Sequence, residues 1–387
     1  MGKELEYKGN DYVEYIVHEN QISRLEMHEM LNFMKLHECT YLYGSGKCGS
    51  GFMEYCDVCG FDIKGFVTSD TLKQFLEEYQ PGKYGLILTL KSDYYPEILP
   101  LLWGKVDIKD ILLFKESTKD IFIRTFSREY LENNMWIVLP LAKHCIVNCA
   151  SCNMFSPICD KEFYTYEEVK RDVDHLKAIE LHLSKINITG GEPLLNPEFV
   201  DILGYIRSRY DNLRIEVYTT ALPIGNFSEE ELKQIGMISP TFMVTDYGIN
   251  ESVFKSALET LDFYGIKYQV NLDGDGKKFY KKIIDFDRNV PKYEYINCQY
   301  YTFCFAPILF NGVLYKCPMA LNSDAINGAF DKNIELTDED FLKLCNVDKP
   351  SQIYDFWRHR LSMCSYCPPV TESVPWRKSE RKIEEWT

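Results

Sequence analysis

Three cysteines within one short stretch are the first candidates for chemistry in this sequence. Cys145, Cys149 and Cys152 follow the spacing C-x3-C-x2-C in the segment HCIVNCASC. Thiolate is the soft ligand that iron-sulfur clusters take, and three such ligands hold three corners of a 4Fe-4S cube while the fourth iron stays open. Zinc is the alternative, although zinc fingers usually have a fourth ligand nearby. The spacing favours a cluster with one open iron.

A second motif, INITGGEPLLNP, places Gly190, Gly191, Glu192 and Pro193 at the end of a predicted strand. Glycines at such a point let the backbone come close to a ligand and expose its polar groups. A Gly-Gly-Glu sequence alone is most often an ordinary turn. In combination with the cysteine triplet at the end of the preceding strand, it indicates one shared functional site.

The elements that must position these motifs follow an alternating pattern. Between the strands lie amphipathic segments, such as 166–180, in which Val169, Val173 and Leu176 share one face. Repeated βα units predict a parallel sheet or partial barrel with its active site at the carboxyl ends of the strands. Strands are predicted at 136–139, 186–189, 213–218, 242–245 and 268–272.

The pattern divides the chain into five segments, on a prior of roughly 150 residues per domain. An α/β pattern precedes the cysteine triplet, with strands predicted at 86–90 and 111–114, and a cysteine-rich segment follows the βα units. The predicted segments are a helical lead-in (1–36), a Rossmann-like α/β domain (37–120), a connection (121–135), a partial barrel (136–290) and a small cluster-binding extension (291–387).

The N-terminal α/β segment carries a glycine loop. Gly44-x-Gly46-x-x-Gly49 follows a strand and precedes a helix, and Asp70 follows the next strand, which is the context of a dinucleotide-binding fingerprint. The segment is too short for a full six-stranded dinucleotide fold. Binding of a nicotinamide nucleotide, of a nucleotide-sugar or of a partner protein therefore all stay open.

The composition indicates which partners and which cellular compartment to expect. The 387 residues carry 58 acidic and 43 basic side chains, and this net charge of −15 argues against nucleic acid as a partner. No apolar run predicts a membrane span and the first residues carry no export signal, so we expect a cytoplasmic protein. In that compartment the 14 cysteines are reduced or metal-bound rather than paired in disulfides.

The cysteine triplet and the GGEP motif together resemble the radical S-adenosylmethionine (SAM) superfamily over residues 136–290. The resemblance implies a partial (β/α)6 barrel and a 4Fe-4S cluster whose open iron is chelated by SAM. It also implies that residues 190–192 contact the methionine amino group, and that the reduced cluster cleaves SAM to a 5′-deoxyadenosyl radical that abstracts a substrate hydrogen. A flavodoxin- or ferredoxin-type donor would supply the electron.

Four further residues are predicted near SAM or the substrate by position. Ser151 stands where the family often has an aromatic residue near the adenine, so the adenine contacts stay open. Thr219 lies at the next strand end, and Asp246 and Tyr247 lie at the one after it. Ordinary turn residues are the alternative interpretation for each of them.

The C-terminal cysteines resemble the SPASM or twitch extension of the same superfamily. Cys304-x7-Gly-x4-Cys317 and Cys364-x2-Cys367 predict a second, auxiliary 4Fe-4S cluster. Cys298 is an alternative to Cys304 as a ligand, and a zinc-ribbon-like site is the alternative to the cluster. The charged tail RKSERKIEEWT is predicted to be a solvated helix.

These features predict a radical SAM enzyme, an oxidoreductase or epimerase, that acts on a carbohydrate or nucleotide-sugar in glycan or capsule biosynthesis. Dehydrogenation would pass an electron to the auxiliary cluster, whereas epimerisation needs a thiol hydrogen donor. Two alternatives are a radical SAM enzyme that modifies a ribosomal peptide and a non-catalytic iron-sulfur protein for electron transfer or redox sensing. The spare cysteines that could donate hydrogen are Cys159, Cys298 and Cys345.

Overall fold

The computed structural model describes residues 22, 24–271, 278–298, 306–368 and 371–387, and every statement about structure refers to these. Contacts divide them into two compact units. We call residues 133–291 and 306–387 the barrel unit, and residues 16–132 and 292–304, as far as they are described, the N-terminal unit.

The barrel unit is built on an eight-stranded sheet in the order β13-β12-β11-β5-β6-β7-β8-β9. The five consecutive strands from β5 to β9 pair in parallel, as the sequence pattern predicts. The predicted α/β class with a parallel sheet is confirmed. The strands are β5 (Ile137–Ala142), β6 (Lys185–Gly190), β7 (Arg214–Thr219), β8 (Thr241–Thr245), β9 (Lys267–Asn271), β11 (Ile308–Phe310), β12 (Val313–Tyr315) and β13 (Phe341–Lys343).

The sixth parallel strand of this sheet comes from the C-terminal part of the chain. Strand β11 pairs in parallel with β5, through Ile308 and Val138, so β11 and β9 lie at the two ends of the parallel part of the sheet. Strands β12 and β13 continue the sheet beyond β11 with antiparallel pairing. The cysteine-rich C-terminal segment is thus joined to the barrel by a continuous sheet.

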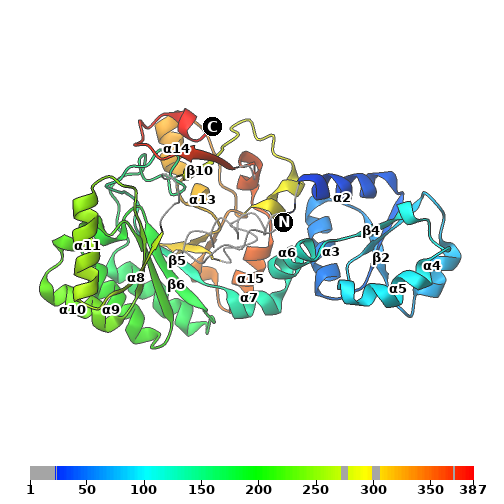
Figure 1. The fold of residues 1–387 in the computed structure, drawn as a ribbon, viewed down its shortest axis with the longest axis horizontal. Coiled ribbons are helices and arrows are strands. Elements are labelled where there is room, and N and C mark those ends of the chain that lie inside the picture. The colour runs from blue at the N-terminus through cyan, green and yellow to red at the C-terminus, as the bar shows by residue number, and fades with distance from the viewer. Residues whose placement is uncertain (1–21, 23, 272–277, 299–305, 369–370) are drawn as a thin grey trace. The chain divides into compact units, whose positions relative to one another are not determined.

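Helices α8 (Tyr166–Ala178), α9 (Phe199–Arg209), α10 (Glu229–Ile238) and α11 (Glu251–Phe263) connect the parallel strands and lie along one side of the sheet (Figure 1). Helix α8 begins at a capping box, in which Thr165 and Glu168 satisfy each other's backbone N–H groups. Val169, Val173 and Leu176 are buried on the face that was predicted.

Side chains alternate between the two faces of the sheet, as strand geometry requires. On β6 and β7 the buried apolar side chains of Ile186, Ile188, Ile215 and Val217 occupy one face. The other face, which we call the inner face, is polar: Glu216 accepts hydrogen bonds from Lys185 Nζ at 2.7 Å and from the Tyr218 hydroxyl at 3.1 Å. A buried sheet face that serves only for packing is normally apolar, so the polar inner face is unusual.

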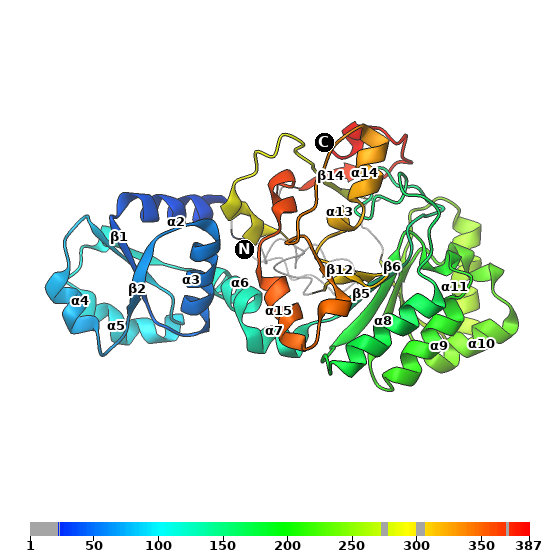
Figure 2. The same ribbon diagram turned by 180° about the vertical axis from the view of Figure 1, so that it is seen from behind.

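The remaining elements of the barrel unit follow the parallel strands. Strand β10 (Lys278–Lys282) pairs antiparallel with β14 (Thr371–Pro375). The helices of this part are α13 (Pro318–Leu321), α14 (Ser323–Phe330) and α15 (Pro350–Arg358), and α14 lies near the C-terminus in both views (Figures 1 and 2).

The C-terminal tail, residues 376–387, is not the solvated helix that its charge predicts. Glu385 is 1% exposed and Trp386 is 0% exposed, and the tail's helical structure is the single 3-10 turn Ile383–Glu385. Trp386 stacks on Phe155, with ring centroids 5.8 Å apart. The prediction failed because apolar burial of the tryptophan outweighs the preference of its charged neighbours for water.

The N-terminal unit contains a four-stranded parallel sheet in the order β2-β1-β3-β4, with helices on both faces (Figure 2). Phe52 packs against Phe122, while Phe75 and Leu102 pack with Leu86 in a second cluster. The strands are β1 (Cys39–Tyr43), β2 (Ile63–Val67), β3 (Tyr84–Leu88) and β4 (Ile111–Leu113). The helices are α2 (Arg24–Leu36), α3 (Lys47–Cys59), α4 (Leu72–Glu78), α5 (Tyr95–Leu102) and α6 (Glu116–Phe126), and α7 (Arg128–Asn134) follows.

The glycine loop of this unit lies between β1 and α3. Gly44 has φ +104°, a conformation that favours glycine, and a Cβ at Gly49 would overlap the carbonyl oxygen of Gly44. Packing of α3 against its own loop therefore explains both glycines, and nucleotide binding there stays a prediction. Within the described ranges, none of the helices combines the length and the apolar character that crossing a membrane requires.

Candidate functional site

The cysteine loop and the Gly-Gly-Glu motif leave neighbouring strands side by side. Strands β5 and β6 are parallel, and Ala142 pairs with Gly190 at their carboxyl ends. The pairing continues beyond the strands: Gly191 N donates to Ala142 O at 2.6 Å, and Glu192 N donates to His144 O at 3.0 Å. The first residues of the cysteine loop are therefore hydrogen-bonded to the Gly-Gly-Glu motif.

Both glycines of the motif are required by this close approach. Gly190 has φ +130°, and a Cβ there would overlap the backbone of Ala142. A Cβ on Gly191 would overlap the carbonyl group of His144 and would lie 2.9 Å from Cys145 N. The sequence predicts glycines that approach a ligand, and the structure adds that they approach the cysteine loop itself.

The three cysteines of the loop are free thiols near one another. Cys145 interacts electrostatically with Cys152 and Cys149, and burial raises the pKa of Cys145 and of Cys149 to about 12. Burial also raises the pKa of Cys152. Without a metal these thiols stay protonated, whereas iron replaces the proton of each ligand.

The three thiols of the loop are candidate ligands of one iron-sulfur cluster. A 4Fe-4S cube binds each thiolate at a different iron and therefore needs ligands that are spread apart. Cys145, Cys149 and Cys152 would hold the cluster, with one corner left open.

Glu192 is fully buried and its carboxylate is held by the end of β7. Oε1 accepts from Thr219 Oγ1 at 2.6 Å and from Leu194 N at 3.2 Å, while Oε2 accepts from Thr220 N at 2.9 Å and from Thr220 Oγ1 at 2.6 Å. Burial raises the pKa of Glu192. Thr219, predicted as a cofactor contact, thus donates its hydroxyl hydrogen to Glu192 and joins the ends of β6 and β7. Pro193 follows as the first residue of a buried 3-10 turn.

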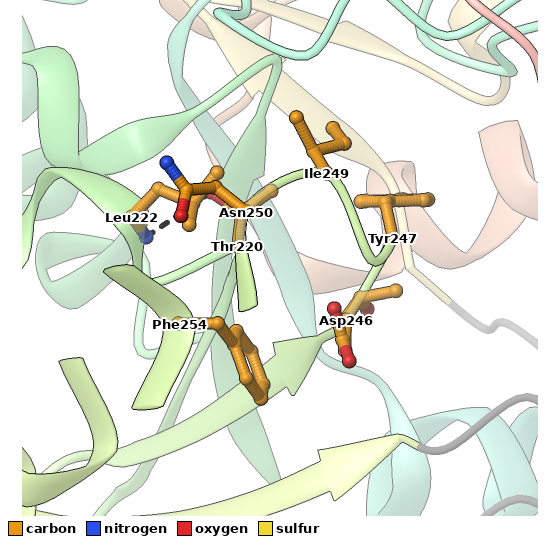
Figure 3. Close-up of a pocket in the computed structure, with 8 residues that line it drawn as sticks. Thr220, Leu222, Asp246, Tyr247, Ile249, Asn250 and Phe254 are labelled. Atoms are coloured by element: carbon orange, nitrogen blue, oxygen red, sulfur yellow. Dashed lines mark hydrogen bonds between the residues drawn. The ribbon is translucent and has the colours of Figure 1, made fainter. Parts of the chain in front are cut away.

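A small hollow lies at the carboxyl ends of β7 and β8, with an empty volume of about 190 Å³ including its open mouth. Asp246 and Tyr247, two predicted residues, lie with Asn250 in the loop between β8 and α11, and Leu222 belongs to the segment that follows β7 (Figure 3). Asp246 Oδ1 accepts from Gly248 N at 2.6 Å, which shapes the loop. The hollow is lined by Thr220, Leu222, Thr245, Asp246, Tyr247, Ile249, Asn250 and Phe254.

Sequence reasoning missed the part that the C-terminal tail plays at the cysteine loop. Ser151, 3% exposed with φ +59°, donates its hydroxyl hydrogen to Glu385 O at 2.6 Å and so faces the tail. Backbone bonds join the tail to the loop, from Ala150 N to Arg377 O at 2.9 Å and from Ser379 N to Asn148 O at 2.7 Å. Two tryptophans in an otherwise charged segment were the signal that could have indicated burial of this tail.

Two tail tryptophans also donate to the cysteines of the loop. Trp376 Nε1 donates to Cys149 Sγ at 3.1 Å, and Trp386 Nε1 donates to the carbonyl oxygen of Cys152 at 3.0 Å. One indole therefore bonds to a predicted metal-binding sulfur and the other to the backbone beside it.

Three of the C-terminal cysteines meet at one hydrophobic cluster. Cys317, Cys364 and Cys367 all pack against it, beside Met319 and Met363. Cys304 lies outside the described residues. Cys298 belongs to the N-terminal unit, where its backbone N–H donates to Tyr295 O.

Two buried aspartates hold the segments that carry these cysteines. Asp172 Oδ2, on α8, accepts from the backbone N–H of Gly312 at 2.6 Å, and Gly312 has φ +76° in the β11–β12 turn. Asp340 Oδ1 accepts from Met363 N at 2.9 Å, which fixes the start of the C-x2-C segment. The hairpin and the C-x2-C segment are thus positioned by the barrel unit itself.

The three spare cysteines differ in their surroundings. Cys159 packs against the same hydrophobic cluster, interacts electrostatically with Cys152, and has its pKa raised to about 12 by burial. Its Sγ lies 3.4 Å from Asn322 Oδ1. Cys345 is exposed in the 3-10 turn Leu344–Asn346.

One segment of the chain matches a known protein family. Residues 139–292 match the family model described as the Radical SAM superfamily. The matched segment begins in β5 and contains the cysteine loop, the Gly-Gly-Glu motif and the hollow at β7 and β8.

Curated relatives match over shorter stretches. An uncharacterized protein of Methanocaldococcus jannaschii is 28% identical over 26% of this chain and 35% of its own length. A probable GTP 3′,8-cyclase of Pyrococcus horikoshii is 24% identical over 33% of this chain and 44% of its own length. The chain thus matches less than half the length of these relatives.

Solved structures with some similarity include BtrN, crystallised with AdoMet and 2-DOIA, and the hydrogenase maturase HydG from Carboxydothermus hydrogenoformans. BtrN is 14% identical, with a TM-score of 0.36 over 60% of this chain and 92% of its own. HydG is 16% identical, with a TM-score of 0.28 over 48% of this chain and 45% of its own.

Proposed function

We propose that this chain, whose residues 139–292 match the Radical SAM superfamily model, is an enzyme that cleaves SAM reductively and abstracts hydrogen from a carbohydrate or nucleotide-sugar. The observation that carries the proposal is the backbone pairing of the Gly-Gly-Glu motif with the entry to the cysteine loop. It brings three thiols and the backbone of two glycines to one end of the sheet.

When bound, the reduced cluster supplies one electron that splits SAM into methionine and a 5′-deoxyadenosyl radical. The chain's own part is to hold three irons through Cys145, Cys149 and Cys152 and to leave the fourth open. The backbone of Gly190 and Gly191 would offer polar groups to the methionine end of SAM. Asp246 and Tyr247, in the wall of the hollow, are placed to contact its nucleoside end or the substrate.

A second cluster is proposed at the C-terminal cysteines. Cys317, Cys364 and Cys367 pack against one hydrophobic cluster, which supports three of its ligands. The fourth ligand would be Cys304 or, alternatively, Cys298. An auxiliary cluster at this place would accept the electron that remains on the substrate radical, with loss of a proton, in a dehydrogenation.

Epimerisation is the other outcome of the same abstraction, and it needs a hydrogen atom returned to the opposite face of the carbon. Among the three spare thiols, Cys159 has the position that best supports this role, because it is half-buried and lies within electrostatic range of Cys152. Cys345 is exposed at the surface, and Cys298 belongs to the N-terminal unit.

The polar inner face of the sheet supports a polar substrate. Glu216, Lys185 and Tyr218 form a hydrogen-bonded set on that face, which runs from the amino end of β6, at Lys185, along β7. Hydroxyl-rich ligands are recognised by such groups. The glycine loop of the N-terminal unit is proposed to bind the nucleotide part of a nucleotide-sugar, and a flavodoxin- or ferredoxin-type protein in the cytoplasm to supply the electron.

The test is anaerobic turnover of the reconstituted, reduced protein. Formation of 5′-deoxyadenosine from SAM, lost in Cys149→Ala, is the expected result, and its absence in the wild type refutes the enzyme proposal. A panel of nucleotide-sugars and phosphorylated sugars in deuterium oxide then separates the outcomes by mass spectrometry. Solvent deuterium in the product indicates epimerisation, whereas a ketone or aldehyde product without it indicates dehydrogenation.

A further inference from the structure

Cys149 differs from the other two cysteines of the loop in receiving hydrogen bonds from two aromatic side chains. Trp376 Nε1 donates to its Sγ at 3.1 Å, and the side chain of Tyr247 also hydrogen-bonds to Cys149. The two rings lie together, with centroids 6.0 Å apart and planes at 36°. One ring comes from the loop after β8 and the other from the C-terminal tail.

The tail holds its indole at this sulfur by bonds that do not involve the sulfur. Cys149 and Lys378 form an antiparallel bridge, and Ala150 N donates to Arg377 O at 2.9 Å. The tail is also tied to itself, because the buried Glu385 accepts from Arg377 Nη1 at 3.2 Å and from Glu380 N at 2.7 Å. The N–H group of Trp376 is therefore directed at Cys149 by the fold.

We propose that Trp376, with Tyr247, raises the reduction potential of the cluster that Cys145, Cys149 and Cys152 hold. Reduction adds negative charge to the cluster and its sulfurs, and a donor hydrogen bond to a thiolate stabilises that charge. The reduced state gains more from the bond than the oxidised state, so the potential rises. Trp376 touches a ligand and not the substrate, so it is a tuning residue; this inference rests on the proposed function.

The test compares two tryptophan variants of the full chain. Trp376→Phe keeps an aromatic ring and removes the N–H donor to sulfur. Trp386→Phe removes the N–H donor to the Cys152 carbonyl oxygen and leaves every bond to sulfur in place. The pair separates hydrogen bonding to sulfur from attachment of the tail to the loop.

The measurement is the midpoint potential of the reconstituted cluster, from an anaerobic redox titration followed by electron paramagnetic resonance. The signal to follow is the one that changes when SAM is added to a parallel sample. We expect a more negative midpoint in Trp376→Phe, and a smaller reduced fraction at any fixed potential, with no shift in Trp386→Phe. An unchanged midpoint in Trp376→Phe, or an equal shift in both variants, overturns the inference.

Failure of the proposed function has a different signature, which is the lack of any SAM-responsive signal in the wild type. Iron content and the unfolding midpoint show whether each variant is loaded and folded. If Trp376→Phe does not load iron, Tyr247→Phe provides the second test, because it removes the other donor to Cys149. A negative shift there supports the inference, and an unchanged midpoint overturns it.

Discussion

The carboxylate of Glu192 gives the sharpest prediction, because all four of its hydrogen bonds are known. Glu192→Gln replaces one oxygen by an amide nitrogen, and each oxygen accepts one backbone N–H and one threonine hydroxyl. The hydroxyl can rotate and accept from the new amide. The backbone N–H, of Leu194 or of Thr220, cannot rotate and is left facing another donor.

The expected loss of unfolding free energy is about 1 to 3 kcal/mol, the usual cost of one buried donor without a partner. Removing a buried charge offsets part of this loss, since burial already raises the pKa of Glu192. The net effect on the apoprotein should still be destabilising, because four donors surround the carboxylate.

The assay is urea unfolding of the apoprotein followed by tryptophan fluorescence. It reports mainly on the barrel unit, which contains Trp136, Trp357, Trp376 and Trp386, four of the five tryptophans. Glu259→Gln is the matched control: Glu259 is exposed on α11, and the change there should stay within about 0.5 kcal/mol. If Glu192→Gln is as stable as this control, the carboxylate does not join β6 to β7 as described.

Further predictions concern two other glycines and three cysteines. Gly191→Ala should lose about 1 to 3 kcal/mol of stability and bind less iron, because the new Cβ overlaps a carbonyl group of the cysteine loop. In contrast, Gly204→Ala, at an open place in α9, should stabilise the protein in the same urea assay by up to about 1 kcal/mol. Burial raises the pKa of Cys48 from 9.0 to about 12, so its contribution to stability is present below pH 9 and is lost as the pH rises toward 12. Between pH 8 and about pH 10.5 the wild type should lose about 2 kcal/mol more than Cys48→Ala, and equal losses would contradict this. Cys145→Ala should abolish formation of 5′-deoxyadenosine, whereas Cys364→Ala should reduce substrate turnover more than SAM cleavage, as chromatography of both products will show.

The regular part of the barrel unit could be predicted because local patterns determine it. The helix at 166–180 and the strand at 242–245 were placed within about two residues of their observed ends, since apolar periodicity and capping residues are properties of contiguous sequence. The two motifs at the strand ends followed from that placement, because the carboxyl ends of parallel strands lie at one edge of a sheet.

Pairings between distant segments could not be predicted in this way. Strand β11 is only three residues long, and nothing in Ile308–Phe310 indicates that it pairs with β5 rather than with β9. The partner of Glu192 was missed for a similar reason. Thr219 and Thr220 appear in the sequence as turn residues, and only the fold brings their hydroxyls to the carboxylate.

The tail that covers the cysteine loop also has a consequence for how the protein is made. Trp376 and Cys149 are separated by 227 residues, so the ribosome produces the loop long before the segment that closes over it. At the usual 5–20 residues per second, that delay is roughly 10 to 45 s. During this interval the tail cannot close over the three thiols, so the order of synthesis provides a time in which iron and sulfide can reach them.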